Sequence, residues 1–290
     1  MYEDEFLEFL KNDERNEREI KGDYYYVNYE DIEIQLKPIH WRALWIIVSR
    51  GISEETVAIN ALIESYIDLD NKYISEDTAW RAIRVLITLG LFEVNKIKTG
   101  YRNFDILILT GAGKHFYIKK FRKNPPIPEY MQILKDHASL IHGYMIKDVK
   151  HILEETGIYK SVSMSRSSNV IHLSDGKSVI PDLICQTDDN QYYYYEVECG
   201  NHNQRDFNTK CNKLKEITTD IYIIGQNRTT VTKKLKPQVE KWIESVGKYS
   251  LWMSDVYVYL YSISDLKLDK TTYFYDMESK EPICCFDKKH

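Results

Sequence analysis

Residues 75–110 read SEDTAWRAIRVLITLGLFEVNKIKTGYRNFDILILT, and the spacing of their apolar residues changes at Gly90. Before Gly90 the apolar positions recur at helical spacing, and Ser75 is a favourable helix N-cap. After Gly90 apolar and polar residues alternate on either side of Thr99-Gly100, which suits the turn of a hairpin. This stretch therefore predicts a helix over residues 76–89 followed by two antiparallel strands.

Two more helices are expected upstream of this stretch. HWRALWIIVSRG follows Lys37-Pro38 with apolar residues at helical spacing, and Gly51 is a stop signal. Ser53 with two glutamates after it starts a second helix that runs to Ile63. Three helices and a hairpin resemble a winged helix-turn-helix domain, which we assign to residues 37–122.

The third helix and the hairpin supply the candidate DNA contacts. Ala82, Val85, Leu86 and Leu89 share the inward face of the helix, and a recognition helix reads base edges from its other side. Basic hairpin residues would pair with neighbouring phosphates. The predicted DNA-binding residues are Thr78, Arg81, Arg84, Lys96, Lys98 and Arg102.

Local charge favours a polyanion partner for this domain. The whole chain has a net charge of −5, which argues against a protein that simply coats DNA, but residues 72–123 hold eleven basic residues against four acidic ones. Residues 1–36 are an acidic accessory segment, with a helix expected over 4–21 and a strand pair in YYYVNYEDIEIQL. The alternative is a winged helix that binds protein instead of DNA.

A second domain is expected after a proline-rich linker at residues 123–134. A long helical stretch runs over 129–156, and strand-like and helical segments alternate beyond Gly157. We assign residues 135–290 to a mixed α/β domain, so that the chain as a whole is a two-domain α/β (α+β) protein.

Three acids are the strongest chemical signal in the second domain. Pro181-Asp182 lies at one predicted strand, and Glu196-Val197-Glu198 ends another that is rich in tyrosine. Residues two apart on a strand project to one side, and an adjacent strand can bring Asp182 alongside them. Converging carboxylates repel unless a hard cation lies between them, so we expect Mg²⁺ or Mn²⁺ at Asp182, Glu196 and Glu198.

This pattern resembles the PD-(D/E)XK nuclease superfamily, a mixed sheet flanked by helices, over about residues 135–225. The resemblance implies a Mg²⁺- or Mn²⁺-dependent DNA endonuclease with Asp182 and Glu196 at the acidic positions. Glu198 stands where the family usually has lysine, so the catalytic lysine is expected on the following helix, as Lys210 or Lys213. The family's helix glutamate corresponds to Glu154 or Glu155, of which Glu155 is taken as the further metal ligand.

Two other interpretations of these acids stay open. Glu196 and Glu198 are also typical of solvated edge-strand residues that discourage aggregation. The missing lysine also fits an inactive nuclease fold that only docks on DNA, which would make the protein a non-enzymatic adaptor or regulator. His142, His151 and His172 are given no role.

Together, IHGYMIKDVKHIL, IPDLI and YYYYEVECG after a winged helix resemble the replication-relaxation family of plasmids and conjugative elements. The resemblance implies a role in mobile-element DNA replication or transfer. The implied partners are double-stranded DNA and replication or transfer proteins, and a homodimer is a further expectation because winged helices often dimerise.

Composition indicates a cytoplasmic protein without a membrane partner. No run of about 18 apolar residues occurs, and the N-terminus is acidic where a signal peptide would be basic. The five cysteines are an odd set without a C-x-x-C pair, which predicts reduced thiols.

Overall fold

The computed structural model describes residues 25–29, 32–65, 73–137, 139–247, 250, 256–268, 270–275 and 283–287. The fold class is mixed α/β, as predicted. The chain divides into two compact units, the first comprising residues up to Ile97 with Asn103–Gln132, the second Lys98–Arg102 with the residues from Ile133 onward. The helix expected over 4–21 lies outside the described residues.

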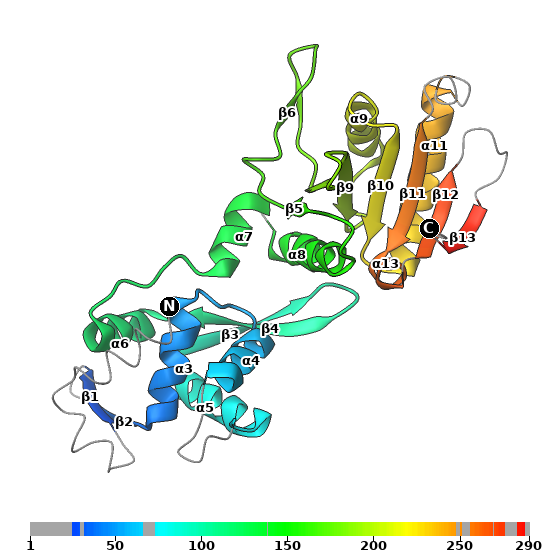
Figure 1. The fold of residues 1–290 in the computed structure, drawn as a ribbon. Coiled ribbons are helices and arrows are strands. Elements are labelled where there is room, and N and C mark those ends of the chain that lie inside the picture. Colours follow the sequence, from blue (N-terminus) through cyan, green and yellow to red (C-terminus); the bar gives the residue numbers. More distant parts are fainter. Residues whose placement is uncertain are drawn as a thin grey trace. The chain divides into compact units, whose positions relative to one another are not determined.

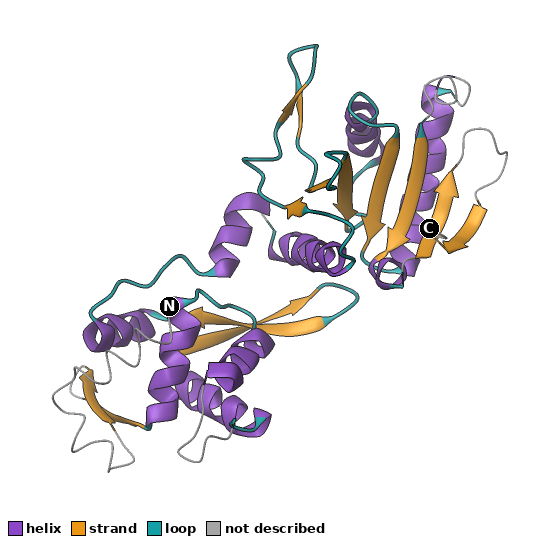
Figure 2. Cartoon of the chain, in the orientation of Figure 1, coloured by secondary structure: helices purple, strands orange, loops and turns teal. Residues whose placement is uncertain are grey.

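The first unit has helices packed with a β-hairpin, labelled in Figure 1 and coloured by element type in Figure 2. Its elements are β1 (Tyr25–Tyr29), β2 (Ile32–Leu36), α3 (Pro38–Ser49), α4 (Glu55–Ser65), α5 (Glu76–Thr88), β3 (Phe92–Lys98), β4 (Asn103–Leu109) and α6 (Gly111–Phe121). The strand pair, the three helices and the hairpin expected from the sequence are all present. Ser75 caps α5 by accepting a hydrogen bond from the Thr78 backbone N–H at 3.2 Å.

The core of the first unit is formed by the inward faces of α3, α4, α5 and α6. Trp41 and Trp45 are buried and pack against Phe121 at ring-centroid distances of 6.1 and 4.9 Å. On α5 the buried residues are Ala79, Ala82, Ile83 and Leu86. The four residues predicted to face inward all contribute to this core, with Val85 and Leu89 half-buried, and Ala79 and Ile83 join them.

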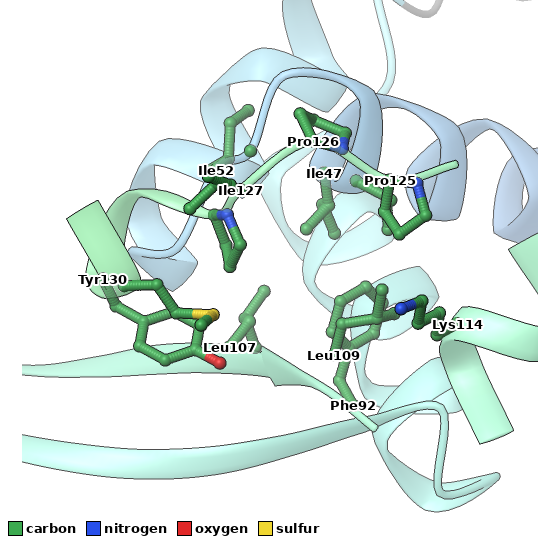
Figure 3. A pocket seen from close by; sticks show the side chains of 14 residues that line it. Ile47, Ile52, Phe92, Leu107, Leu109, Lys114, Pro125, Pro126, Ile127 and Tyr130 are labelled. Carbon is green, nitrogen blue, oxygen red and sulfur yellow. The ribbon is translucent and has the colours of Figure 1, made fainter. Parts of the chain in front are cut away.

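The proline-rich segment predicted as a linker packs against the first unit. Glu129 donates its backbone N–H to the Gly51 carbonyl at 2.9 Å, and Tyr130 donates to Ser53 Oγ at 3.1 Å. A cavity of about 260 Å³ lies beneath the segment. Its wall consists mainly of apolar side chains, and Lys114 and Tyr130 also line it (Figure 3). Residues 125–130 are thus part of a packed unit and do not form an independent spacer.

The helix predicted over 129–156 is two helices, α7 (Glu129–His137) and α8 (Leu140–Glu155). Ser139 has extended backbone angles and its hydroxyl accepts from the His142 N–H at 3.4 Å. A serine in that conformation ends continuous helix and caps a new one. The single-helix prediction was therefore wrong at this point, because apolar spacing alone does not register such a cap.

The second unit contains a seven-stranded mixed sheet among its described residues, in the order β13-β12-β11-β10-β9-β8-β5. Its elements after α8 are β5 (Ser161–Ser163), β6 (Ile171–His172), β7 (Ser178–Val179), β8 (Leu183–Gln186), β9 (Tyr192–Glu198), α9 (Gln204–Leu214), β10 (Asp220–Gly225), α10 (Arg228–Thr230), the π-helical η1 (Val231–Leu235), α11 (Lys236–Val246), β11 (Tyr257–Ser262), α13 (Ile263–Lys267), β12 (Lys270–Tyr275) and β13 (Ile283–Asp287). Strands β5, β8 and β9 are antiparallel neighbours, whereas β9, β10 and β11 run parallel.

Two apolar clusters cover the two faces of this sheet. Side chains of α9, η1 and α11 pack on one face, where Ile223 and Leu260 point, and side chains of α8 and α13 pack on the other. The second face carries a row of aromatic rings from Tyr195, Tyr222 and Tyr259 to Phe274, with centroids 4.7–4.8 Å apart. These residues are cross-strand partners, so the tyrosine-rich strands use their rings for packing.

Candidate functional site

Four of the six predicted DNA-binding residues lie on exposed or half-exposed parts of α5 and β3. Thr78, Lys96 and Lys98 are exposed, as is Arg81, which pairs with Asp77 one turn earlier at 2.8 Å. Such a pair between solvated side chains contributes little and is easily exchanged for another anion. The surface that the sequence predicts is thus presented by α5 and β3.

The other two predicted DNA-binding residues are joined to carboxylates. Arg84 lies 3.2 Å from Glu55 and stacks over the Trp80 ring at 5.0 Å. Arg102 makes two 2.7 Å hydrogen bonds to the carboxylate of Asp148 within the second unit. A phosphate would have to displace these carboxylates before it could bind either guanidinium.

Asp182 and Glu196 are brought together by the pairing of β8 with β9. Leu183 pairs with Tyr195 in the antiparallel register, so the next position places Asp182 opposite Glu196. Asp182 lies just before β8 begins, and its Oδ2 accepts the Val197 backbone N–H at 2.9 Å. The side chain therefore takes over a hydrogen bond that the β8 backbone would otherwise supply.

Asn169 holds the chain that leads into Asp182. This buried amide donates to the carbonyls of Ser163 and Pro181 at 3.2 and 3.1 Å, and its Oδ1 accepts from Ser163 Oγ at 2.8 Å. Sequence reasoning missed Asn169, because no local motif marks an asparagine that satisfies backbone groups twelve residues away. Its effect is to fix the backbone position of Asp182.

Glu196 and Glu198 lie on the face of β9 that α9 covers, and both are buried, with 1% and 2% of their surfaces exposed. These values exclude the solvated edge-strand interpretation. Burial raises the pKa of Glu196 well above its usual value; the charge of Lys210 opposes this shift, and the Asp182 carboxylate adds to it. Glu196 is therefore the acid of the cluster that keeps a proton most readily.

Lys210 on α9 lies between the two glutamates. Its Nζ is 2.9 Å from Glu196 Oε2 and 2.7 Å from Glu198 Oε1. Although burial lowers the pKa of Lys210, the carboxylates of Glu196, Glu198 and Asp182 outweigh that effect and hold it well above its usual value. The lysine that is missing from the strand pattern is thus supplied from the next helix.

The other catalytic and metal candidates are placed elsewhere. Lys213 donates to the Ser178 carbonyl at 3.0 Å, so of the two lysines left open by the sequence only Lys210 reaches the acids. Glu155 is exposed at the end of α8 and lies 3.1 Å from His151 Nε2. In the described part of the chain, Lys213 and Glu155 form no hydrogen bond or ion pair with Asp182, Glu196 or Glu198.

Two histidines contact different acids of the cluster. His142 Nε2 lies 2.7 Å from the Val197 carbonyl and 3.4 Å from Asp182 Oδ2. His202 Nδ1 lies 2.9 Å from Glu198 Oε2, and this hydrogen bond raises the pKa of His202. Burial alone would raise the pKa of Glu198, but His202 and Lys210 hold it below its usual value. His142, to which the sequence assigned no role, is therefore a member of the site.

Asp182 is the most strongly ionised acid of the cluster. Burial acts to raise its pKa, but the hydrogen bond from His142 and the charge of Lys210 hold that pKa well below the usual range. The site thus combines two ionised carboxylates, at Asp182 and Glu198, with a protonatable carboxyl at Glu196 and the ammonium group of Lys210. Separate proton affinities of neighbouring groups are common where acid–base chemistry occurs.

Glu196 has unused hydrogen-bonding capacity. Its distance to Lys210 is that of an ion pair, but neither carboxyl oxygen has a hydrogen-bond partner in the described part of the chain. Buried carboxyl oxygens are usually bonded, and a cation or its water would satisfy them. By contrast, both Glu198 oxygens already have partners, so Asp182 and Glu196 fit a divalent cation better than Glu198 does.

No family model, curated protein or solved structure matched the chain. The described residues contain no helix both long and apolar enough to cross a lipid bilayer.

Proposed function

We propose that this chain is a DNA-handling protein whose second unit cleaves or nicks DNA in a metal-dependent reaction. The observation that carries the proposal is Lys210, which lies within 2.9 Å of both Glu196 and Glu198 at the end of β9. An ammonium group from a helix beside paired acids supports the PD-(D/E)XK interpretation despite Glu198 in the usual lysine position. The order of elements also agrees with the PD-(D/E)XK interpretation. Helix α8 is followed by the antiparallel strands β5, β8 and β9, and then by β10, which runs parallel to β9.

In this proposal Asp182 and Glu196 hold Mg²⁺ or Mn²⁺, which when bound polarises the scissile phosphate and acidifies a water molecule. Lys210 places positive charge beside the phosphate oxygens, where negative charge develops during cleavage. Glu198 keeps the Lys210 side chain in position through its ion pair, and His202 holds Glu198 from the other carboxylate oxygen. Asn169 holds the backbone next to Asp182 in position through its hydrogen bond to the Pro181 carbonyl.

The winged helix-turn-helix domain assigned to residues 37–122 is proposed to bind double-stranded DNA through Thr78, Arg81, Lys96 and Lys98. Support comes from their exposure and from the excess of basic residues over 72–123. The motifs that resemble the replication-relaxation family extend the proposal to replication or transfer of mobile-element DNA, with proteins of that process and a second copy of the chain as further partners.

Nicking of supercoiled plasmid by the purified full chain in Mg²⁺ or Mn²⁺ is the direct test. Asp182→Asn and Lys210→Ala are expected to lower the nicking rate by at least about 100-fold, because each removes charge at the reacting phosphate. Lys213→Ala is the matched control, since it removes a lysine from the same helix without touching the acids. Equal nicking by wild type and Asp182→Asn would refute the catalytic assignment.

A non-enzymatic DNA adaptor is the second candidate, favoured by one specific observation. Lys210 already gives the two glutamates a shared cationic partner, so the buried acids have a counter-charge without a metal ion. An adaptor predicts DNA binding in gel shifts with no metal-dependent nicking under any of the conditions above.

A further inference from the structure

A second group of ligands meets Asp182 from the side of α7 and α8. The ligand atoms of His137, His142 and Asp182 all lie within 4.8 Å of one another. His137 ends α7 and His142 lies in the first turn of α8, so the break between these helices brings the two imidazoles together. Their rings are 6.1 Å apart at a right angle.

Two features mark this group as more than a chance meeting of polar side chains. The Nε2 atom of His137 is buried and has no hydrogen-bond partner in the described part of the chain. The three side chains also line one cavity of about 160 Å³, together with Asp136 and Arg166. A buried imidazole nitrogen facing a cavity without a donor or acceptor is available as a ligand.

The contacts of His142 show which of its atoms faces the triad. His142 Nε2 is 3.4 Å from Asp182 Oδ2 and 2.7 Å from the Val197 carbonyl, which can only accept, so this nitrogen carries a proton that a cation at the triad would have to replace. Asp182 is in turn held by the Val197 backbone N–H.

The donor set selects the class of cation. Mg²⁺ prefers oxygen ligands, whereas two imidazoles with one carboxylate suit first-row transition metals such as Zn²⁺ or Mn²⁺. Asp136 and Asp182 supply two carboxylates to the cavity against the single guanidinium of Arg166, which favours a divalent cation. Arg166 then lies where it can contact an anion bound to that cation, such as a phosphate ester.

The geometry points to a transition-metal site formed by His137, His142 and Asp182, with Arg166 as the accompanying anion-binding residue. This inference goes beyond the proposed function, because metal binding at the triad requires no DNA cleavage. It also assigns roles to His137 and Arg166, which lie outside the Asp182–Glu196–Glu198–Lys210 cluster.

Co²⁺ titration of metal-free full-length protein, followed by visible absorption, tests the site. One Co²⁺ per chain is expected, displaced by Zn²⁺ but not by the same concentration of Mg²⁺. His137→Ala should weaken Co²⁺ binding by at least about tenfold. This variant removes no hydrogen bond at Nε2, so the chain should stay folded by circular dichroism.

His151→Ala is the matched control, since His151 lies on α8 and pairs with exposed Glu155 instead. A thiolate charge-transfer band would locate the ion at cysteine and overturn the inference, as would unchanged affinity in His137→Ala, no stoichiometric Co²⁺ binding, or displacement by Mg²⁺. Co²⁺ binding at the triad without plasmid nicking would support this site and contradict the proposed nuclease; nicking without Co²⁺ binding would do the reverse.

Discussion

Asp265 is a buried acid outside the candidate site whose bonding is extensive. Its Oδ1 accepts from Arg228 Nε at 2.8 Å, and its Oδ2 accepts from Ser262 and Thr272 hydroxyls at 2.6 and 2.5 Å. Burial acts to raise the pKa of Asp265, but these donors hold it below the usual value. The carboxylate therefore joins the start of α13 to β12.

Asp265→Asn is predicted to lower the free energy of unfolding by about 1–3 kcal/mol at pH 7, because it removes a charge-assisted acceptor. A depressed folded-state pKa contributes stability above the unfolded-state value of about 3.9 and loses it as the pH falls through the folded-state value. The difference between wild type and variant in urea unfolding should thus shrink below about pH 4. A difference independent of pH would contradict this, and Asp188→Asn, at an exposed aspartate, is the control.

The acids of the candidate site could be found from the sequence, whereas their partners could not. The alternation of residues along β9 places Glu196 and Glu198 together, and the proline before Asp182 marks its strand. Choosing between Lys210 and Lys213 needs the rotation of α9 relative to β9, which is a matter of tertiary packing. His137 and Asn169 meet the site only through the α7–α8 break and the loop before β6.

At the scale of elements, α6 offers a matched pair of glycines. Gly113 lies so close to the hairpin that an added Cβ would come 2.1 Å from the Leu91 carbonyl oxygen, whereas a Cβ on Gly111 would meet nothing within 4 Å. Alanine normally favours a helix over glycine by about 1 kcal/mol. Packing should reverse that preference at Gly113.

Gly113→Ala is accordingly predicted to destabilise the first unit by about 1–3 kcal/mol, the usual cost of overpacking, since the obstructing atom belongs to the backbone. Gly111→Ala should be neutral or slightly stabilising. Thermal unfolding of both variants checks the prediction, and equal melting temperatures would show that α6 can move away from Leu91 at no cost.

Most elements could be predicted from periodicity and capping, as α5 and the β3–β4 hairpin illustrate. The strands β12 and β13 were not predicted, because they follow the last strong apolar run and pair by tertiary contacts. The α7–α8 break was missed because a single serine cap interrupts an otherwise helical pattern.

At the scale of the whole molecule, the proposed DNA contact of the winged helix predicts that DNA binding depends on salt concentration. Removing one phosphate contact should reduce the slope of log K against log salt by about 1 and weaken binding equally on all sequences. Lys98→Ala is the change to make, because Lys98 is exposed on β3. Fluorescence anisotropy with duplexes of different sequence measures both quantities.

Lys98→Arg keeps the charge and should keep the slope, which makes it the control. An unchanged slope in Lys98→Ala would remove Lys98 from the DNA interface, and no measurable affinity of wild type at low salt would favour the protein-binding interpretation of the winged helix.

The row of rings from Tyr195 to Phe274 has a consequence for the acids on the opposite face. Side chains alternate along a strand, so a shift of β9 by one residue would put Tyr195 under α9 and the two glutamates among the α8 side chains. Large rings stacked at the strand spacing resist such a shift. The aromatic face thus sets the alignment of β9 with its neighbours, and residues without any chemical role decide that Glu196 and Glu198 meet Lys210.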